Sequence, residues 1–146
     1  MPEIKFDIGL VTYNLNGKCE VTFNPADSEF MECFYNAFDA LGTIHDEYSK
    51  RISGDAPTDA FSLARERDGK MRQTIDDLFD VPVYAAAFGT VSPCAFASGF
   101  PVWLNFMLSV ADEIMANLDD VEKQIDPRVA KYTSKYKKYA AKYHKK

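Results

Sequence analysis

Histidine, cysteine and paired acidic residues are the side chains of this sequence that could do acid–base, nucleophilic or metal chemistry. His45, Asp46 and Glu47 are consecutive, but neighbouring helical residues point about 100° apart, so these groups do not converge on one substrate atom. The pairs Asp76-Asp77 and Asp119-Asp120 have the same limitation. These positions predict solvated helix surfaces rather than a catalytic or metal centre.

Three cysteines, Cys19, Cys33 and Cys94, are odd in number and far apart. Their number and spacing argue against a disulfide framework and fit a reducing compartment. A nucleophilic Cys94 would need a nearby base, and the sequence places neither histidine beside it. Glycine-rich nucleotide-binding motifs, the serine-hydrolase motif and zinc-binding cysteine pairs are absent. We therefore expect no enzymatic activity, no cofactor and no metal ion.

The most distinctive pattern is a stripe of tyrosine and lysine near the C-terminus. Tyrosine recurs every three or four residues and each tyrosine follows a lysine, so a helix here would carry a tyrosine stripe bordered by a lysine stripe. The residues that we single out in this stripe are Tyr132, Lys135, Tyr136, Lys138, Tyr139, Lys142 and Tyr143.

Three interpretations of the tyrosine–lysine stripe stay open. The tyrosines cover the protein's own core; or the helix docks on a protein partner, because a tyrosine ring buries area while its hydroxyl keeps a polar partner; or the stripe contacts nucleic acid through phosphates and stacked bases. Self-association through opposite charges is a further form of protein contact.

Charge is divided unevenly along the chain. The formal net charge is −5. Residues 1–125 contain 21 acids and 9 bases, a balance of −12, whereas residues 126–146 contain 1 acid and 8 bases, a balance of +7. The acidic body would repel a phosphate backbone, which disfavours nucleic acid as the partner. We divide the chain into an acidic domain of hairpin and helices, 1–125, and a basic Lys/Tyr C-terminal helix or tail, 126–146.

Length and apolar patterning limit the class of protein. A chain of 146 residues suits one core. The first residues lack a basic region followed by an apolar run, so we expect no signal peptide. The most apolar stretch, Phe100–Ala111, is shorter than the roughly 20 residues of a transmembrane helix. We expect a cytoplasmic protein without membrane contact.

Alternating apolar residues predict two strands, Ile4–Tyr13 and Lys18–Phe23, joined by Asn16-Gly17. Asn-Gly favours a type I′ turn because both residues tolerate positive φ. A lone hairpin is marginal in water, so we expect it to pack on helices. Asn24 and Pro25 then predict the N-cap and first residue of a long amphipathic helix that ends near Ile52.

Further helices follow this first one. We expect one from Thr58 or Asp59 to about Asp80, a short one over Val83–Phe88 closed by Gly89, one from Pro101 to about Gln124, and a last one from Pro127. Residues 91–100 are expected to be irregular because of their prolines and glycine. The predicted fold is α+β, mostly α: an N-terminal β-hairpin followed by a four- to five-helix bundle.

The weakly charged segment from Phe88 to Trp103 is either inner core or an exposed apolar patch for a partner. In the second case Phe100 and Trp103 would adjoin the tyrosine–lysine stripe. Together they form the surface that we predict to bind a partner.

Several short motifs resemble those of a family of small proteins. The motifs are a hairpin leading into residues 23–30 (FNPADSEF), then Asp77-Leu78-Phe79, Ala87-Phe88-Gly89, residues 99–103 (GFPVW) and residues 126–133 (DPRVAKYT) before a basic end. In this order they resemble small uncharacterised proteins from the tail-morphogenesis region of Firmicutes siphophages and prophages, over most of the chain. The resemblance implies a chaperone-like role in tail assembly and no catalytic residues.

The resulting hypothesis is a non-enzymatic phage or prophage protein that assists tail assembly by binding a tape-measure or tail-tube protein. It would act in the host cytoplasm. The alternative is a phage-encoded inhibitor of a host defence or host enzyme, which acts through an acidic surface that mimics nucleic acid.

Overall fold

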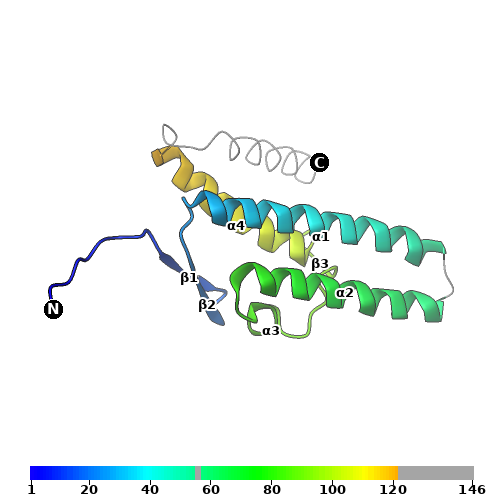
Figure 1. The fold of residues 1–146 in the computed structure, drawn as a ribbon. Helices are drawn as coiled ribbons and strands as arrows, with labels where there is room; N and C mark the ends of the chain where they lie inside the picture. The colour runs from blue at the N-terminus through cyan, green and yellow to red at the C-terminus, as the bar shows by residue number, and fades with distance from the viewer. Residues whose placement is uncertain (55–56, 122–146) are drawn as a thin grey trace.

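A computed structural model describes residues 1–54 and 57–121 of the chain. In that part, a two-stranded hairpin is followed by the helices α1 (Ser28–Gly54), α2 (Pro57–Phe79), α3 (Val83–Phe88) and α4 (Val102–Val121) (Figure 1). The fold is α+β and mostly α, with an N-terminal antiparallel hairpin, as the sequence predicts. The predicted last helix from Pro127 and the predicted domain boundary after residue 125 lie outside the described residues.

The hairpin consists of β1 (Val11–Leu15) and β2 (Cys19–Phe23), paired antiparallel with Val11 opposite Phe23. Asn16 and Gly17 have φ of 55° and 70°, which confirms the predicted tight turn. The N–H of Lys18 donates to the carbonyl of Leu15 across this turn at 3.0 Å.

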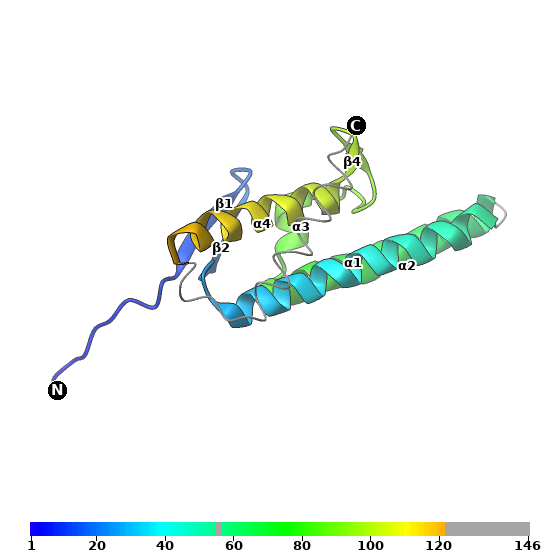
Figure 2. The same ribbon diagram turned by 90° about the horizontal axis from the view of Figure 1, so that it is seen from above.

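The first strand is shorter than the predicted Ile4–Tyr13, because pairing begins only at Val11. Its partner strand ends at Phe23, and Pro25 then removes a backbone donor and turns the chain toward α1. Residues 1–10 therefore have no strand beside them within the described part of the chain. They form an exposed N-terminal arm that leads away from the body (Figures 1 and 2).

Helix α1 begins at Ser28, three residues later than predicted. Asn24 closes a turn instead, accepting from the N–H of Ala26 at 2.8 Å through its side chain. Asp27 takes the capping role: its carboxylate accepts from the N–H of Glu29 at 3.0 Å. Two capping residues lie close together here, and the second one starts the helix.

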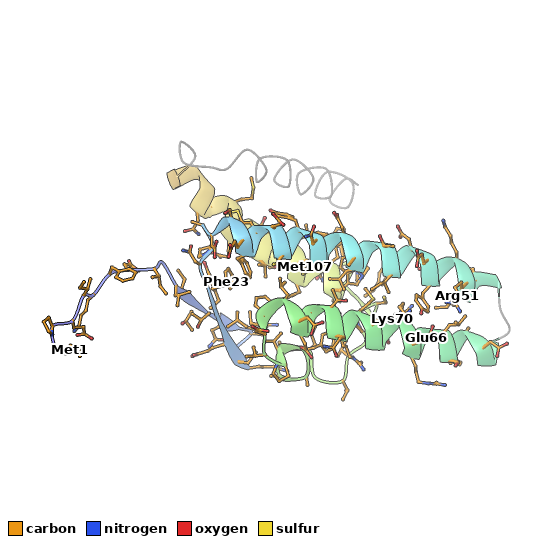
Figure 3. All side chains as sticks on the ribbon, viewed as in Figure 1. Met1, Phe23, Arg51, Glu66, Lys70 and Met107 are labelled. Carbon is orange, nitrogen blue, oxygen red and sulfur yellow. The ribbon has the colours of Figure 1, made fainter. Side chains whose placement is uncertain are left out.

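The core lies between α1, the second half of α2, and α4. Helices α1 and α2 form a long antiparallel pair, and α4 runs back along the first half of α1 (Figures 1 and 2). Phe38 of α1 meets Trp103 of α4 edge-on, with ring centroids 6.1 Å apart. Met107 of α4 and Met71 and Ile75 of α2 are 0 % exposed in the same cluster (Figure 3).

The chain between α3 and α4 contains more order than predicted. Gly89 closes α3 with φ of 65° and an N–H that donates to Ala85. The short strands β3 (Phe96–Ala97) and β4 (Phe100–Pro101) then pair antiparallel. Ser98 and Gly99 between them both have positive φ, so this pair repeats the turn chemistry of the first hairpin.

Candidate functional site

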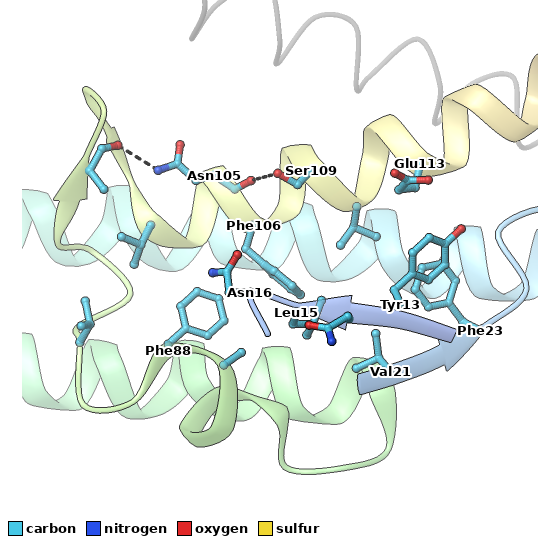
Figure 4. A pocket seen from close by; sticks show the side chains of 16 residues that line it. Tyr13, Leu15, Asn16, Val21, Phe23, Phe88, Asn105, Phe106, Ser109 and Glu113 are labelled. Carbon is cyan, nitrogen blue, oxygen red and sulfur yellow. Dashed lines mark hydrogen bonds between the residues drawn. The ribbon is translucent and has the colours of Figure 1, made fainter. Parts of the chain in front are cut away.

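A groove of about 550 Å³ lies between the hairpin, α3 and α4. Helix α4 supplies two parallel rows of side chains to it, each with four-residue spacing. One row is apolar, Val102, Phe106 and Val110, and the other is polar, Asn105, Ser109 and Glu113 (Figure 4). Residues four apart lie on one helix face, so this single helix provides both an apolar wall and a polar rim.

Aromatic rings make the apolar wall continuous. Phe106 meets Phe88 of α3 at 5.3 Å and Phe79 of α2 at 6.0 Å between ring centroids. Phe79 is in turn 6.0 Å from Phe23 of β2, which stacks on Tyr13 of β1 at 4.8 Å. The groove therefore lies over a row of rings that connects β1, β2, α2, α3 and α4.

The rim side chains are held by hydrogen bonds. The amide of Asn105 donates to the carbonyl of Ala97 at 2.9 Å, and the Ser109 hydroxyl donates to the carbonyl of Asn105 at 2.9 Å (Figure 4). The Asn14 side chain accepts from the N–H of Gly17 at 2.6 Å. Amides along an apolar groove suit a peptide segment, whose backbone needs donors and acceptors while its side chains are buried.

Only part of the predicted partner surface is described. Trp103 is 1 % exposed and belongs to the core, so its ring offers a partner no surface, because Phe38 and His45 contact it. Phe100 is half-buried in β4 and is not among the groove's lining residues. The seven tyrosines and lysines of the predicted stripe, Tyr132, Lys135, Tyr136, Lys138, Tyr139, Lys142 and Tyr143, lie outside the described residues.

A second cluster brings together residues that the sequence analysis kept apart. His45 of α1, which we predicted to be solvated, is half-buried. Its Nδ1 accepts a hydrogen bond from the Trp103 indole at 3.2 Å and lies 3.4 Å from the sulfur of Cys94. The Cys94 thiol lies 3.6 Å from the sulfur of Met71. The base that Cys94 seemed to lack is therefore 49 residues away in sequence.

The electrostatics of this cysteine–histidine pair disfavour a nucleophile. Burial raises the pKa of Cys94 to about 11, and burial also lowers the pKa of His45. Both groups are thus neutral near pH 7. A neutral imidazole has one acceptor nitrogen, and the Trp103 indole already donates to it. The cluster stabilises the packing of α1 against α4 and does not form an ion pair of thiolate and imidazolium.

Metal and membrane criteria give no further site in residues 1–54 and 57–121. That part of the chain contains no group of three or more His, Cys, Asp or Glu side chains arranged to hold a metal ion. It also contains no helix with the length and hydropathy needed to cross a membrane.

The sequence analysis named no groove; Phe106 and Val110 of α4 line it while also packing in or against the core. A signal was present, because apolar residues cover more than one face of this helix. Val102, Phe106 and Val110 form one row and Trp103, Met107 and Ile114 form another.

Comparisons with protein-family models, with curated proteins and with solved structures find no match.

Proposed function

We propose that this protein is a non-enzymatic binding protein whose groove receives an apolar segment of a protein partner. The observation that carries the proposal is the groove itself, with its aromatic wall and its hydrogen-bonded polar rim. A groove of this kind shields apolar side chains of a partner from water while the rim satisfies the partner's backbone.

The motifs that resemble those of siphophage tail-region proteins support a partner within tail assembly. In this proposal, the groove covers apolar surface of a tape-measure or tail-tube protein before assembly begins. The groove would hold such a surface until polymerisation displaces it. The neutral state of Cys94 and His45 agrees with a role in binding rather than in catalysis.

Co-expression tests this function directly. The full chain is expressed with the tape-measure and tail-tube proteins of the phage or prophage that encodes it, and complexes are isolated through a tag on this chain. We expect one of these proteins to co-purify. Ser109→Trp fills the groove from an exposed rim position and is expected to abolish the complex.

The matched control is Ser62→Trp, which introduces the same side chain at an exposed position of α2 outside the groove. This variant should keep the complex. If neither tail protein co-purifies with the wild-type chain, or if the two tryptophan variants behave alike, the proposed function is wrong.

A further inference from the structure

The N-terminal arm, residues 1–10, presents apolar side chains that nothing in the described chain covers. Ile4, Phe6 and Ile8 are 88 %, 79 % and 58 % exposed. They alternate with the charged residues Lys5 and Asp7, so an extended arm has one apolar side and one charged side. An exposed strand with an apolar side and unpaired backbone is a template for pairing with another chain.

Hydrogen bonds at the base of the arm set its direction. The Asn24 side chain donates to the carbonyl of Ile8 at 2.9 Å, and the Asp7 carboxylate accepts from the N–H of Gly9 at 2.8 Å. Gly9 has φ of 74°, and an added Cβ would lie only 2.6 Å from the Asn24 amide. These contacts fix the root of the arm against the start of α1 and direct its tip away from the body (Figure 1).

The groove matches the arm in length and in capacity. It extends along α4 from Val102 to Glu113, about 16 Å at 1.5 Å per residue. The distance from Ile4 to Ile8 in a strand is about 13 Å. A cavity of about 150 Å³ admits one benzene ring, so the groove volume of about 550 Å³ has room for the three apolar side chains of one arm.

We propose that the groove of each copy holds the N-terminal arm of a second copy, with Phe6 against the aromatic wall and the arm backbone along the polar rim. Reciprocal exchange between two copies gives a closed dimer. The dimer itself does not depend on the proposed partner. If the arm also covers the groove until the tail protein displaces it, that second role rests on the proposed function.

The area that such an exchange buries is enough for a stable dimer. Each large apolar side chain covers on the order of 150 Å², so the three side chains of one arm remove about 450 Å² of their own surface from water, and the smaller groove surface beneath them brings the total to about 650 Å². Two arms together bury about 1,300 Å², which lies in the lower part of the range of about 1,200–2,000 Å² for stable specific interfaces. The exchange with a second copy therefore buries enough area to hold a dimer together.

Light scattering coupled to size exclusion measures the oligomeric state of the full chain. We expect the wild-type chain to be a dimer and Phe6→Asp to be a monomer, because a charge on the apolar side of the arm cannot enter the groove. Lys5→Glu is the matched control, since it changes charge on the opposite side of the same arm. It should remain a dimer. A monomeric wild-type chain, or equal behaviour of the two variants, overturns the proposal.

Disulfide cross-linking identifies the contact. Phe6→Cys and Ser109→Cys are combined with Cys33→Ser, which removes an exposed native thiol. We expect oxidation to give a covalent dimer on a non-reducing gel. A disulfide closed within one chain would show that the arm occupies its own groove, and the absence of a disulfide would show that it does not reach the groove; both results overturn the proposal.

Failure of the dimer and failure of the proposed function are distinguishable. Phe6→Asp leaves the groove intact, so this variant should still co-purify with the tail protein, whereas Ser109→Trp should lose both the dimer and the complex. A wild-type monomer that binds the tail protein would overturn the exchange alone. A dimer that binds neither tail protein would overturn the proposed function alone.

Discussion

His45 is held in one tautomer by its neighbours. The Trp103 indole donates to Nδ1 of the imidazole, which places the imidazole proton on Nε2. The Cys94 sulfur approaches the same nitrogen. Protonation of Nδ1 would turn this acceptor into a donor, so that two N–H groups, those of the imidazole and the indole, would face each other. A neutral His45 is therefore part of the native packing of α1 on α4.

This arrangement makes stability depend on pH. Burial lowers the pKa of His45 in the folded state below its ordinary value of 6.5, so below pH 6.5 the unfolded chain binds more protons at this position. The contribution of neutral His45 to the free energy of unfolding is fully present above pH 6.5, and it is lost as the pH falls through the folded-state pKa of His45. In thermal unfolding scans, we expect Tm of the wild-type chain to fall more steeply below pH 6.5 than Tm of His45→Gln.

His45→Gln is informative because glutamine keeps an acceptor for the Trp103 indole and does not titrate. The carboxylates and His144 are common to both proteins, so the difference between the two curves isolates His45. If the two plots of Tm against pH run parallel between pH 7.5 and pH 5, protonation of the His45 imidazole is not coupled to folding.

The cysteines are expected to differ in reactivity. A thiol with a pKa of about 11 is about 0.1 % ionised at pH 8, and the thiolate is the form that alkylating agents attack. Cys33 is exposed on α1, whereas Cys94 is partly buried against His45 and Met71. Iodoacetamide at pH 8 should modify Cys33 well before Cys94, as measured by mass spectrometry of the peptides over time. Equal rates would contradict the burial of the Cys94 thiol.

The sequence predicts well those turns and helix ends that are determined by the conformational preferences of one or two neighbouring residues. Asn16-Gly17 turns the hairpin and Gly89 ends α3, because positive φ at these positions restricts which residues can stand there. The start of α1 was placed too early because Asn24 and Asp27 are both good caps. Both side chains accept from the N–H two residues later, and the backbone distinguishes them: the carbonyl of Asp27 accepts the first helical bond, from the N–H of Met31 at 3.0 Å.

Elements that depend on a distant partner are those that the sequence predicts poorly. The alternating apolar pattern of Ile4–Tyr13 is real, yet a strand also needs a neighbour, and β2 ends opposite Val11. Similarly, periodicity identifies the apolar residues of α4 without saying that Trp103 enters the core while Phe106 lines a groove. Those outcomes are set by tertiary packing, which local patterns do not contain.

Two glycines allow the same substitution to be tested in opposite backbone settings. Gly17 has φ of 70° in the hairpin turn, and Gly69 lies within α2; an added Cβ meets nothing within 4 Å at either position. Gly17→Ala should destabilise the protein by about 1–2 kcal/mol because of the left-handed backbone. Gly69→Ala should stabilise it by about 1 kcal/mol through helix propensity. Urea unfolding measures both, and shifts of the same sign would contradict this contrast.

At the scale of the whole molecule, the α1–α2 pair is longer than the body that supports it. Its tip extends beyond α4 and the β3–β4 pair in both views (Figures 1 and 2). The residues of α1 that are buried in the main core end at Leu41, and the next large buried side chain is Tyr48. The cations of Arg51 and Lys70 lie 5.0 Å and 5.2 Å from the Tyr48 ring centroid.

We therefore predict that the tip of the helix pair, which Tyr48 stabilises, opens separately from the core. The Tyr48 hydroxyl donates to Glu66 of α2. Arg51, Glu66 and Lys70 lie close together near the tip (Figure 3). In hydrogen exchange measured by mass spectrometry, we expect peptides from the tip to exchange faster than those containing Phe38 or Met71.

Tyr48→Ala removes the ring as well as its hydrogen bond, a loss of about 3–5 kcal/mol for a buried aromatic side chain. Because that loss falls on the tip, exchange should accelerate in residues 44–54 and 59–70 and stay unchanged around Phe38 and Met71. Tyr48→Phe keeps the ring between the two cations and removes only the hydroxyl, so it should accelerate exchange at the tip far less. Uniform acceleration over the whole chain would instead mean that the helix pair and the core unfold as one cooperative unit.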